Sequence, residues 1–549
     1  MQRTGGRDLH FGLDAVTIGS DRAFGFGWVF HDSFETASIR LEVGDGSAAP
    51  PASIEAAIWK ARPDVALSFP GHRHSLHSGF YFYGGWAPSG RRPEKASLRV
   101  VFGNGESYVH AIEVNESSQP PTLAARGGAL LRHLRRSLAY ARSGDFRGLF
   151  RRASRYLDDA SLPHSSPAAL DGIVRALARP PLLLVDHDLG GGANRYREEL
   201  VRRELAAGAA VLLLTYDVRR FEYRLELRSA AKKARACAPS LDSIRDLIAG
   251  WRLSAIFYND CVSFREPAGI PVWLAGLRRR TGAVLRVAIH DFLPVCPSQH
   301  LVDAGGKFCG IPELRECRTC LAAHRDGFVS LFASRDIDAW RRDWLELLGG
   351  ADEILCFSES SRLLLLRAYP GLPCEKMAIV PHQIGAAVNA RPVMPAKKPL
   401  HIGVVGNITV HKGALVVRDL AREIARRGLA TKIAVIGSID IAALPDCLSE
   451  TGAYELQQLP GLIESSGANV FLFPSICPET FSYVTEELIR LAAPLVCFRW
   501  GAPAERVGRY DRGRVLDYSG SRKLLDDLLE FHDRLASRPA VQPGGDPRL

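Results

Sequence analysis

The chain has 549 residues, of which 46% are hydrophobic and 24% charged, and it carries a formal net charge of +10. This length exceeds a single core, so roughly three or four domains are expected, and the composition is that of a globular protein. No apolar run reaches the length of about 18 residues that a membrane-spanning helix needs, so no such helix is predicted. The first residues lack the apolar core of a signal peptide.

Cysteine content indicates the cellular compartment, and net charge bears on the possible binding partners. Eleven cysteines without a predicted secretory signal favour a reducing compartment over a disulfide framework, so we expect a cytoplasmic protein. The positive charge permits anionic partners and selects none of them. The basic-aromatic module expected of a nucleic-acid binder is not recognisable, so no nucleic-acid partner is predicted.

Residues 1–118 are predicted to form an all-β sandwich accessory domain. Short alternating runs such as "SIRLEV", "SGFYFYGGW" and "ASLRVVFG" lie between Gly- and Pro-containing turns. Two interpretations of the aromatic residues Trp28 and Trp86 remain open: they stack on the sugar rings of a growing glycan, or they belong to the core of the sandwich.

Residues 119–165 are predicted to be an Arg-rich helical linker. Between Arg126 and Arg155 the only acid is Asp145, and leucines recur among the arginines. A basic amphipathic helix of this kind can lie on an anionic membrane surface, which would make the protein a peripheral membrane protein. The alternative is a solvated linker that packs its leucines on neighbouring domains.

The rest of the chain alternates between strand and helix patterns, which predicts βαβ units with parallel sheets. The first set occupies 166–395 and contains a Cys-rich insertion at 291–324. The second set occupies 396–535, and 536–549 is expected to be a disordered tail. The fold class is therefore α/β, with two Rossmann-like domains expected to face a cleft, preceded by the sandwich and the linker.

Three segments combine a strand end, a turn and a helix start, the arrangement that binds phosphate groups. "DLGGGANRYREEL" contains Gly191 and Gly192, although it is not GxGxxG and a tight turn is the alternative. "GVVGNITVHKGA" contains Gly406, Asn407 and Lys412. "PSICPETFSYVTEELIRL" places Glu479 after an apolar strand and Glu487 among the polar positions of the following helix. Together they predict a phosphorylated sugar ligand.

These segments resemble the GT-B glycosyltransferases, specifically the large retaining family 4 type of bacterial surface-polysaccharide biosynthesis. The resemblance rests on the Gly-rich loop, the "IHD" that contains His290, "CFSESS", "GNITVHKG", and Glu479-x7-Glu487 followed by "GAPAERV". It covers about 180–516. One departure is Asn407, because the family usually has an Arg in a "GR…KG" arrangement, and this puts the donor type in doubt.

The resemblance implies a nucleotide-diphosphate sugar donor held by the second α/β domain and a glycan or lipid-linked acceptor held by the first. It implies that Lys412 binds the diphosphate, Glu487 the ribose hydroxyls and His290 the transferred sugar. Glu479 and the backbone after it would face the donor sugar and diphosphate, and the expected donor-binding set is completed by Gly191, Gly192, Gly406, Asn407, Thr480, Phe481 and Ser482.

The resemblance further implies a hexosyltransferase reaction with retention, with His290 and Glu479 as the catalytic residues. Spacing identifies no dedicated general base, so stabilisation of the departing diphosphate by cations and backbone dipoles is expected, without a catalytic metal. Two alternatives remain: a metal-binding DxD formed by Asp186 and Asp188, and a non-catalytic sugar- or nucleotide-binding protein of a polysaccharide assembly complex.

Four cysteines in the insertion predict a structural zinc site. Cys296, Cys309, Cys317 and Cys320 lie within 25 residues, and the last two form a C-x2-C pair expected in a tight turn. The surrounding Gly and Pro residues offer little apolar material to order the segment by burial. Four reduced thiols in a surface loop are the alternative. No cofactor other than this zinc is expected.

Overall fold

The computed structural model describes residues 8–46, 50–86, 92–114, 165–230, 232–324, 335–384, 392, 394 and 399–537. Its two compact units comprise Met1–Cys356 with Arg362–Val380, and Phe357–Ser361 with Pro381–Leu549. The Arg-rich stretch from Arg126 to Arg155 and most of the expected tail lie outside the described residues. Within the described ranges, no helix combines the length and the apolar character needed to cross a membrane.

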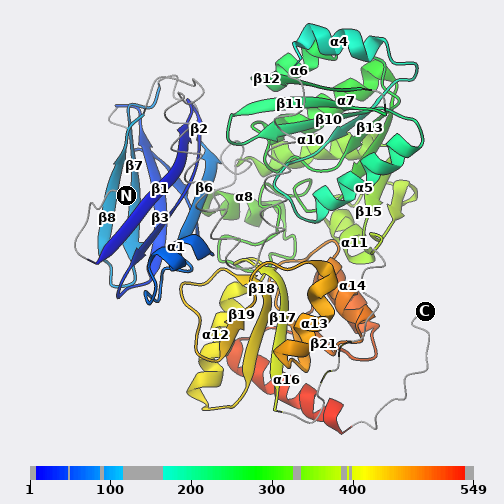
Figure 1. Ribbon diagram of the computed structural model, residues 1–549. Coiled ribbons are helices and arrows are strands. Elements are labelled where there is room, and N and C mark those ends of the chain that lie inside the picture. Colours follow the sequence, from blue (N-terminus) through cyan, green and yellow to red (C-terminus); the bar gives the residue numbers. More distant parts are fainter. Residues whose placement is uncertain are drawn as a thin grey trace. The chain divides into compact units, whose positions relative to one another are not determined.

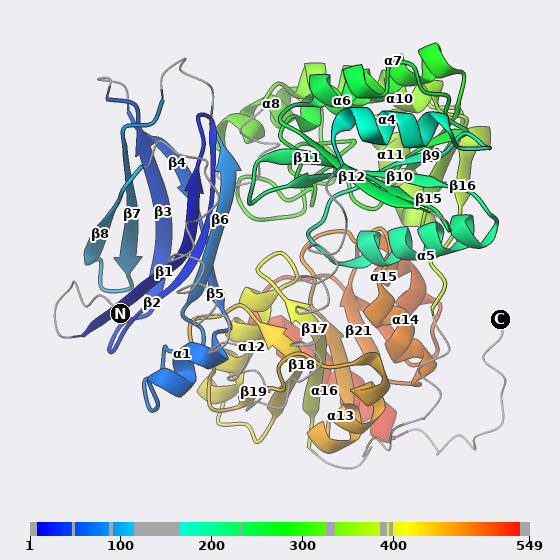
Figure 2. The same cartoon turned by 45° about the horizontal axis from the view of Figure 1, so that its top comes forward.

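The first unit begins with two four-stranded antiparallel sheets (Figures 1 and 2). One has the order β1 (Leu9–Ile18), β2 (Arg22–His31), β6 (Gly79–Gly85), β5 (Ala57–Lys60), and the other β4 (Ala52–Glu55), β3 (Thr36–Gly44), β7 (Lys95–Phe102), β8 (Ser107–Ile112). The helix α1 (Pro63–Ser68) follows β5. Alternate residues of facing strands, including Leu41, Phe82 and Leu98, fill one apolar cluster, as the alternating sequence pattern predicts. Trp86 packs against this cluster.

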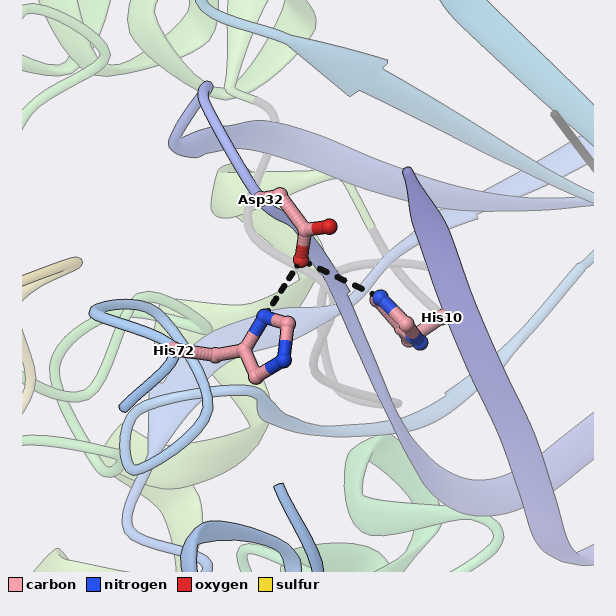
Figure 3. A group of neighbouring side chains, drawn as sticks. All are labelled: His10, Asp32 and His72. Atoms are coloured by element: carbon pink, nitrogen blue, oxygen red, sulfur yellow. Dashed lines mark hydrogen bonds and ion pairs between the residues drawn. The ribbon is translucent and has the colours of Figure 1, made fainter. Parts of the chain in front are cut away.

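The other face of the β1–β2 sheet carries a second group of side chains. Trp28 covers β1 so closely that a Cβ atom on Gly12 would lie 2.6 Å from its ring. On the same face His10 is paired with Phe30 in register, and its imidazole lies beside the Asp32 carboxylate and the His72 ring (Figure 3). Sequence patterning gave no indication of this cluster, because its members come from a strand, a strand end and a loop.

Hydrogen bonds tie this sheet to the α/β part of the same unit. Arg22 Nη1 donates to the Tyr216 hydroxyl at 3.2 Å, and the Tyr83 hydroxyl donates to the Ser263 carbonyl at 2.6 Å. Arg265 Nη2 lies 3.2 Å from Asp21 Oδ2. Since the first two bonds are withdrawn from water, they fix the accessory sheet against its neighbour.

An eight-stranded sheet forms the α/β part of the first unit, in the order β12-β11-β10-β9-β13-β14-β15-β16. The six neighbouring strands from β10 to β16 are parallel to one another, whereas β11 is antiparallel to both β10 and β12. The strands are β9 (Leu182–Val185), β10 (Val211–Asp217), β11 (Glu222–Arg228), β12 (Lys233–Ala238), β13 (Ala255–Tyr258), β14 (Val284–Ala288), β15 (Glu353–Cys356) and β16 (Met377–Ile379). The parallel strands match the expected ones, and the β11–β12 pair was not predicted.

The helices of this part are α4 (Pro167–Arg175), α5 (Gly192–Ala206), α6 (Leu241–Leu247), α7 (Ile270–Thr281), α8 (Leu314–Ala323), α10 (Ile337–Gly350) and α11 (Glu359–Ala368), with short 3-10 turns at Pro267–Gly269 and Cys374–Lys376. Leu274 of α7 and Trp344 of α10 are fully buried with the strands in one large apolar cluster. The runs of buried residues in β9 and β13 are typical of strands covered on both faces.

The second unit contains a wholly parallel six-stranded sheet in the order β19-β18-β17-β20-β21-β22. Its strands are β17 (His401–Ile408), β18 (Lys432–Ile439), β19 (Leu448–Glu450), β20 (Val470–Phe473), β21 (Leu495–Phe498) and β22 (Gly513–Leu516). In chain order this is 3-2-1-4-5-6, the strand order of a doubly wound nucleotide-binding fold. The short strands β19 and β22 were not predicted.

Helices cover both faces of this second sheet. α12 (Ala414–Arg426) and α16 (Ser521–Ala536) contribute to one apolar cluster. α13 (Leu459–Ser466), preceded by a 3-10 turn at Leu456–Gln458, α14 (Tyr483–Arg490) and α15 (Gly501–Gly508) contribute to the other. The expectation of two α/β parts, each built on parallel strands, is therefore met.

Candidate functional site

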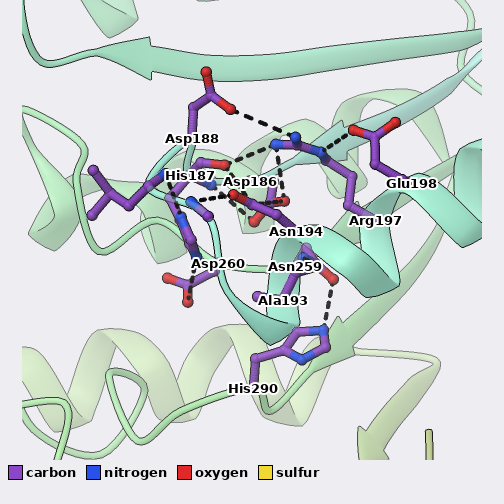
Figure 4. Close-up of polar contacts among 12 residues, drawn as sticks. Asp186, His187, Asp188, Ala193, Asn194, Arg197, Glu198, Asn259, Asp260 and His290 are labelled. Atoms are coloured by element: carbon purple, nitrogen blue, oxygen red, sulfur yellow. Dashed lines mark hydrogen bonds and ion pairs between the residues drawn. The ribbon is translucent and has the colours of Figure 1, made fainter. Parts of the chain in front are cut away.

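Polar residues gather at the carboxyl ends of three neighbouring strands of the first sheet (Figure 4). Asp186 follows β9, Asp260 follows β13, and Asp291 follows β14. Strand β9 lies between β10 and β13, so the chain changes direction across the sheet at this place. Open α/β sheets bind ligands at such a switch point, which makes this edge the first candidate site.

Asp186 is fully buried and connects the end of β9 to the residues that follow it. Its Oδ1 accepts the His187 N–H at 2.9 Å, and its Oδ2 accepts Asn194 Nδ2 at 2.8 Å. Arg197 Nη1 lies 3.3 Å from the same Oδ2, while Arg197 Nη2 lies 3.6 Å from Asp188 Oδ1. The two carboxylates of the DHD motif are thus paired to one guanidinium, an arrangement that disfavours the alternative of a metal-binding DxD.

His187 is held as a neutral ring. The Leu189 N–H donates to its Nδ1 at 3.0 Å, which requires a lone pair there, and burial lowers its pKa. Its Nε2 lies 3.6 Å from Asp260 Oδ2.

Three carboxyl groups at this edge, those of buried Asp186 and Asp260 and of half-buried Asp291, have raised pKa values. Burial raises the pKa of Asp186 to about 6. Burial also raises the pKa of Asp260 and of Asp291, and the charge of Asp260 raises that of Asp291 further. Groups of this kind cluster at functional sites, because a protonated acid can donate to a ligand that a carboxylate would repel.

His290 belongs to this group through Asn259. Asn259 Nδ2 donates to the Ala193 carbonyl at 3.1 Å, so its Oδ1 is left to accept from His290 Nε2 at 2.7 Å. The Tyr196 ring packs against the imidazole with centroids 5.0 Å apart. The imidazole is therefore fixed in orientation by Asn259 of the loop after β13 and by Tyr196 of α5.

The Gly-rich loop provides the backbone turn before α5. Gly190 and Gly191 have φ angles of 90° and 88°, which L side chains rarely adopt, and a Cβ atom on either would meet open space. The Asn194 side chain accepts the Gly190 N–H at 2.6 Å. The loop therefore has room beside it, and it lies at the same sheet edge as Asp186.

The switch point of the second sheet lies between β17 and β20, and it joins two predicted segments. The loop after β17 contains Lys412, and the loop after β20 contains Glu479. Lys412 Nζ lies 3.8 Å from Glu479 Oε1, although the two residues are 67 positions apart in the sequence. Ile476 N–H donates to the His411 carbonyl at 3.1 Å and fixes one loop to the other.

Glu479 has an unsatisfied oxygen. Its Oε1 is buried and accepts no hydrogen bond among the described residues, while the Lys412 ammonium is only an ion-pair neighbour and is nearly half exposed. The Glu479 backbone is packed against α15, whose Ala502 N–H donates to its carbonyl at 2.8 Å. A rigidly placed acid with an unfilled acceptor is typical of a ligand-binding position.

The predicted residues after Glu479 begin α14. Ser482 is its N-cap and accepts the Thr485 N–H at 3.2 Å, as expected of a capping serine. Thr480 is buried, and the Phe481 ring packs against His382 and Tyr483. Since the Tyr483 hydroxyl lies 3.0 Å from His382 Nδ1, that histidine belongs to an aromatic cluster.

Glu487 corrects the expectation of an acid on the polar face of α14. Its side chain is buried, with 5% exposed. Burial, and to a smaller extent the charge of Glu487, raise the pKa of the partly buried Tyr454. The neighbouring Glu486 is less buried, with 13% of its side chain exposed, and it accepts from Arg506 Nη2 at 2.9 Å. Helical periodicity could have separated the two glutamates, because Glu487 lies three residues after Val484 and four before Leu491, on their face of the helix.

The remaining predicted donor residues lie at the end of β17. Gly406 has a φ of 115°, and Asn407 is exposed, with its Oδ1 accepting the Ser438 hydroxyl at 3.0 Å. Among the described residues, Asn407 occupies the place where the family resemblance leads one to expect an arginine.

The four cysteines of the insertion approach one another loosely. Cys317 and Cys320 lie on one helix, α8, rather than in a tight turn. The Ile311 and Ala304 N–H groups donate to Cys309 and Cys320 Sγ, each at 3.4 Å. No three of the four Sγ atoms lie within 4.8 Å of one another.

The expectation that the insertion lacks apolar material is also wrong. Phe292, Leu293, Val295, Leu301 and Ile311 are buried in the main apolar cluster of the first unit. The segment is therefore ordered by burial. The N–H donors to sulfur would suit thiolate ligands of a zinc ion, but the site needs closer sulfur atoms.

Sequence reasoning missed four residues of the first site. Asn194, Arg197, Asn259 and Asp260 surround Asp186 and His290, and only the position of "ND" directly after an apolar strand could have indicated two of them. Arg197 is buried by contacts to both Asp186 and Asp188, which a pattern of arginines on α5 does not reveal.

No family model matches the chain, and no curated protein matches it. Solved structures with a similar fold include HepE of Anabaena in complex with UDP-glucose, at 13% identity and a TM-score of 0.42 over 65% of this chain and 93% of that one. The lipopolysaccharide outer core galactosyltransferase WaaB matches at 10% and 0.42 over 65% and 94%. A glycosyltransferase from Rickettsia africae matches at 12% and 0.41 over 66% and 93%. Similarity at these identities and TM-scores gives no evidence about function. A functional interpretation therefore depends on the residues of this chain.

Proposed function

We propose that this chain is a glycosyltransferase that moves a sugar from a nucleotide-diphosphate sugar to a glycan or lipid-linked glycan. The observation that carries the proposal is the contact of Lys412 Nζ with Glu479 Oε1, 3.8 Å apart at the switch point of a doubly wound sheet. The buried oxygen lacks a hydrogen bond, which a sugar hydroxyl would supply. The neighbouring ammonium suits a diphosphate.

The second unit would hold the donor. Lys412 and the backbone N–H groups at the start of α14 stabilise the diphosphate, Glu479 accepts from the donor sugar, and Glu487 binds the ribose hydroxyls. Gly406 leaves the end of β17 open to the nucleotide, and Asn407 offers an amide where an arginine charge is usual in the family that the sequence resembles. A weaker diphosphate contact follows from that substitution.

The first unit would hold the acceptor and His290 would contact the transferred sugar. The bond from the anomeric carbon to the diphosphate oxygen breaks, and a bond from the same carbon to the acceptor oxygen forms. The acceptor proton passes to the departing phosphate oxygen, which retains the configuration without a protein nucleophile. Preorganised charges in the site lower the barrier by stabilising the departing diphosphate.

The cellular setting is part of the proposal. The resemblance of the sequence motifs supports a role in surface-polysaccharide biosynthesis of the O-antigen or capsule kind, in the cytoplasm. The Arg-rich stretch at 126–155 supports peripheral binding to the inner face of the cell membrane. Co-sedimentation with anionic but not neutral vesicles tests the membrane contact, and binding to neither favours a plain linker.

Structural zinc at Cys296, Cys309, Cys317 and Cys320 is a separate proposal. It is supported by the four thiols and by the N–H donors to two of their sulfur atoms. About one cysteine-bound zinc ion per chain, lost when Cys317→Ser is combined with Cys320→Ser, is the expected result. A metal-free enzyme of full activity contradicts it.

Thermal melting with a panel of nucleoside diphosphates tests the donor site. A ligand at about 100 times its Kd raises the free energy of unfolding by about 2.7 kcal/mol. A labelled sugar donor then tests turnover on extracted glycan acceptors. Stabilisation without turnover on any acceptor supports a non-catalytic binding protein, and no stabilisation by any nucleotide contradicts both.

A further inference from the structure

A group of three potential metal ligands lies in the accessory sheet, remote in sequence from the proposed donor-binding residues (Figure 3). His10 Nε2 lies 3.1 Å from Asp32 Oδ1, and His72 Nδ1 lies 2.6 Å from the same oxygen. Among the residues that the structure describes, these are the only three or more His, Cys, Asp or Glu side chains whose ligand atoms lie within 4.8 Å of one another.

The three side chains come from separate parts of the chain and are held in place by the backbone. His10 is near the start of β1, Asp32 directly follows β2, and His72 lies in the loop after α1. The Asp32 N–H donates to the Asp8 carbonyl at 3.0 Å, and the Ser75 hydroxyl donates to the His72 carbonyl at 2.8 Å. The cluster therefore does not depend on a single flexible loop.

Aromatic rings fix the two imidazoles. His10 stacks on Phe30 with centroids 4.6 Å apart and a tilt of 19°, and its centroid lies 4.9 Å from that of Phe69. Phe30 also lies 5.7 Å from His72. Apolar walls of this kind restrict ring rotation, so the imidazole nitrogens stay directed at Asp32.

Access from solvent is retained on one side. The exposed fraction of the side chain is 10% for His10, 31% for Asp32 and 34% for His72. An ion could reach the three ligand atoms, and water or a ligand oxygen could complete its coordination.

We propose that His10, Asp32 and His72 bind a divalent transition-metal ion of the zinc class. Two imidazole nitrogens and one carboxylate oxygen suit zinc, cobalt or nickel, whereas calcium and magnesium prefer oxygen ligands alone. In a tetrahedral zinc site the ligand atoms are separated by about 3.3 Å, so Asp32 must withdraw by about 0.7 Å from His72. The ion would join β1, the end of β2 and the loop after α1.

The alternative is a metal-free triad in which both rings donate to Asp32. Asp32→Asn separates the two, because the amide oxygen still accepts a hydrogen bond but is a poor metal ligand. His72→Ala removes one nitrogen ligand, and His110→Ala is the matched control. His110 is a partly buried strand histidine of the same domain that packs on Phe11 and Tyr108.

Titration of the chelator-treated full-length chain with Co²⁺ and Zn²⁺ tests the proposal. Cobalt bound by cysteine gives intense thiolate charge-transfer absorption, whereas cobalt bound by histidine and aspartate gives only weak visible bands. The absorption spectrum therefore distinguishes cobalt bound by cysteines of the insertion from cobalt bound by histidine and aspartate. We expect His110→Ala to bind the ion without cysteine ligands as the wild-type chain does. Asp32→Asn and His72→Ala should lose this ion or bind it at least about tenfold more weakly.

Two outcomes of the titration would contradict the metal site. If the wild-type chain binds no ion without cysteine ligands, or if Asp32→Asn and His72→Ala bind this ion as the wild-type chain does, the three residues form only a hydrogen-bonded triad. Melting curves of all variants without metal keep a folding defect apart from a binding defect, because Asp32→Asn is expected to retain most of the metal-free stability.

Discussion

Gly413 and Pro474 are in direct backbone contact: a Cβ atom on Gly413 would stand 2.0 Å from the Pro474 carbonyl oxygen. Gly413 is the N-cap of α12 with a φ of 91°, and Pro474 begins the loop that contains Glu479. Only glycine allows this approach. The distance between Lys412 and Glu479 is therefore set by backbone contact as well as by charge.

Gly413→Ala is expected to destabilise the second unit by about 1–3 kcal/mol, the cost of a strained backbone position, and to weaken nucleotide binding. Melting curves with and without nucleoside diphosphate measure both effects. Gly428→Ala is the matched control, since Gly428 also has a positive φ, of 62°, but its added Cβ meets no atom within 4 Å. Equal effects of the two substitutions would show that the loop contact is unimportant.

Glu479→Gln is expected to lower turnover while leaving the melting temperature unchanged or higher. The buried carboxylate oxygen has no hydrogen bond, so removing its charge relieves a desolvation cost. A residue kept only for stability would show the reverse. Turnover of labelled donor beside a melting curve measures the two quantities, and a fall in stability with unaltered turnover contradicts the assignment.

Glu487→Gln is expected to weaken donor binding by roughly 1.5–3 kcal/mol, the net size of hydrogen bonds to a charged group. Glutamine is preferred to alanine because the side chain is buried, so truncation would add a cavity. Glu486→Gln on the same helix is the control: it breaks the ion pair with Arg506 and should leave nucleotide affinity unchanged. Wild-type affinity in Glu487→Gln would end the assignment to the ribose.

The sequence predicted the parallel strands well because their apolar runs and following turns are local signals. The pair β11 and β12 was missed although the alternation of "EYRLELR" is a strand signal, because an antiparallel pair is not expected within a series of βαβ units. The short strands β19 and β22 carry too few residues to show a period.

The sites were predicted less completely, for a physical reason. Motifs identified residues that lie near one another in sequence, such as Glu479 and Ser482. Contacts between loops, such as Lys412 with Glu479 or His290 with Asn259, depend on strand order, which no local pattern contains. The burial of Glu487 likewise depends on what packs against α14.

Asp186 predicts a pH dependence of stability. Burial raises its pKa from 3.8 to about 6, so the folded protein holds a proton between about pH 4 and pH 6 that the unfolded chain releases. Stability is therefore expected to fall as the pH rises through this window, by about 3 kcal/mol from this group. Urea unfolding at several pH values should show a smaller slope in Asp186→Asn.

The overall stability of Asp186→Asn is expected to be lower at every pH, because the amide cannot serve both Asn194 and Arg197 as the carboxyl does. The slope, and not the mean, is therefore the readout. Asp188→Asn leaves Asp186 in place and should keep the wild-type slope. Identical slopes in all three proteins would mean that Asp186 does not titrate in this window.

The hydrogen bond from His290 Nε2 to Asn259 Oδ1, at 2.7 Å, predicts that Asn259 positions the imidazole for the transferred sugar. Asn259→Leu removes the acceptor at similar size, so His290 can rotate away from Tyr196. We expect kcat to fall by about tenfold or more while the affinity for nucleoside diphosphate is unchanged, because that ligand would be held by the second unit. His290→Ala should lower kcat at least as much, and the double variant should add little, since both residues act through one contact. Multiplicative losses in the double variant, or a loss of nucleotide affinity in Asn259→Leu, would contradict a positioning role.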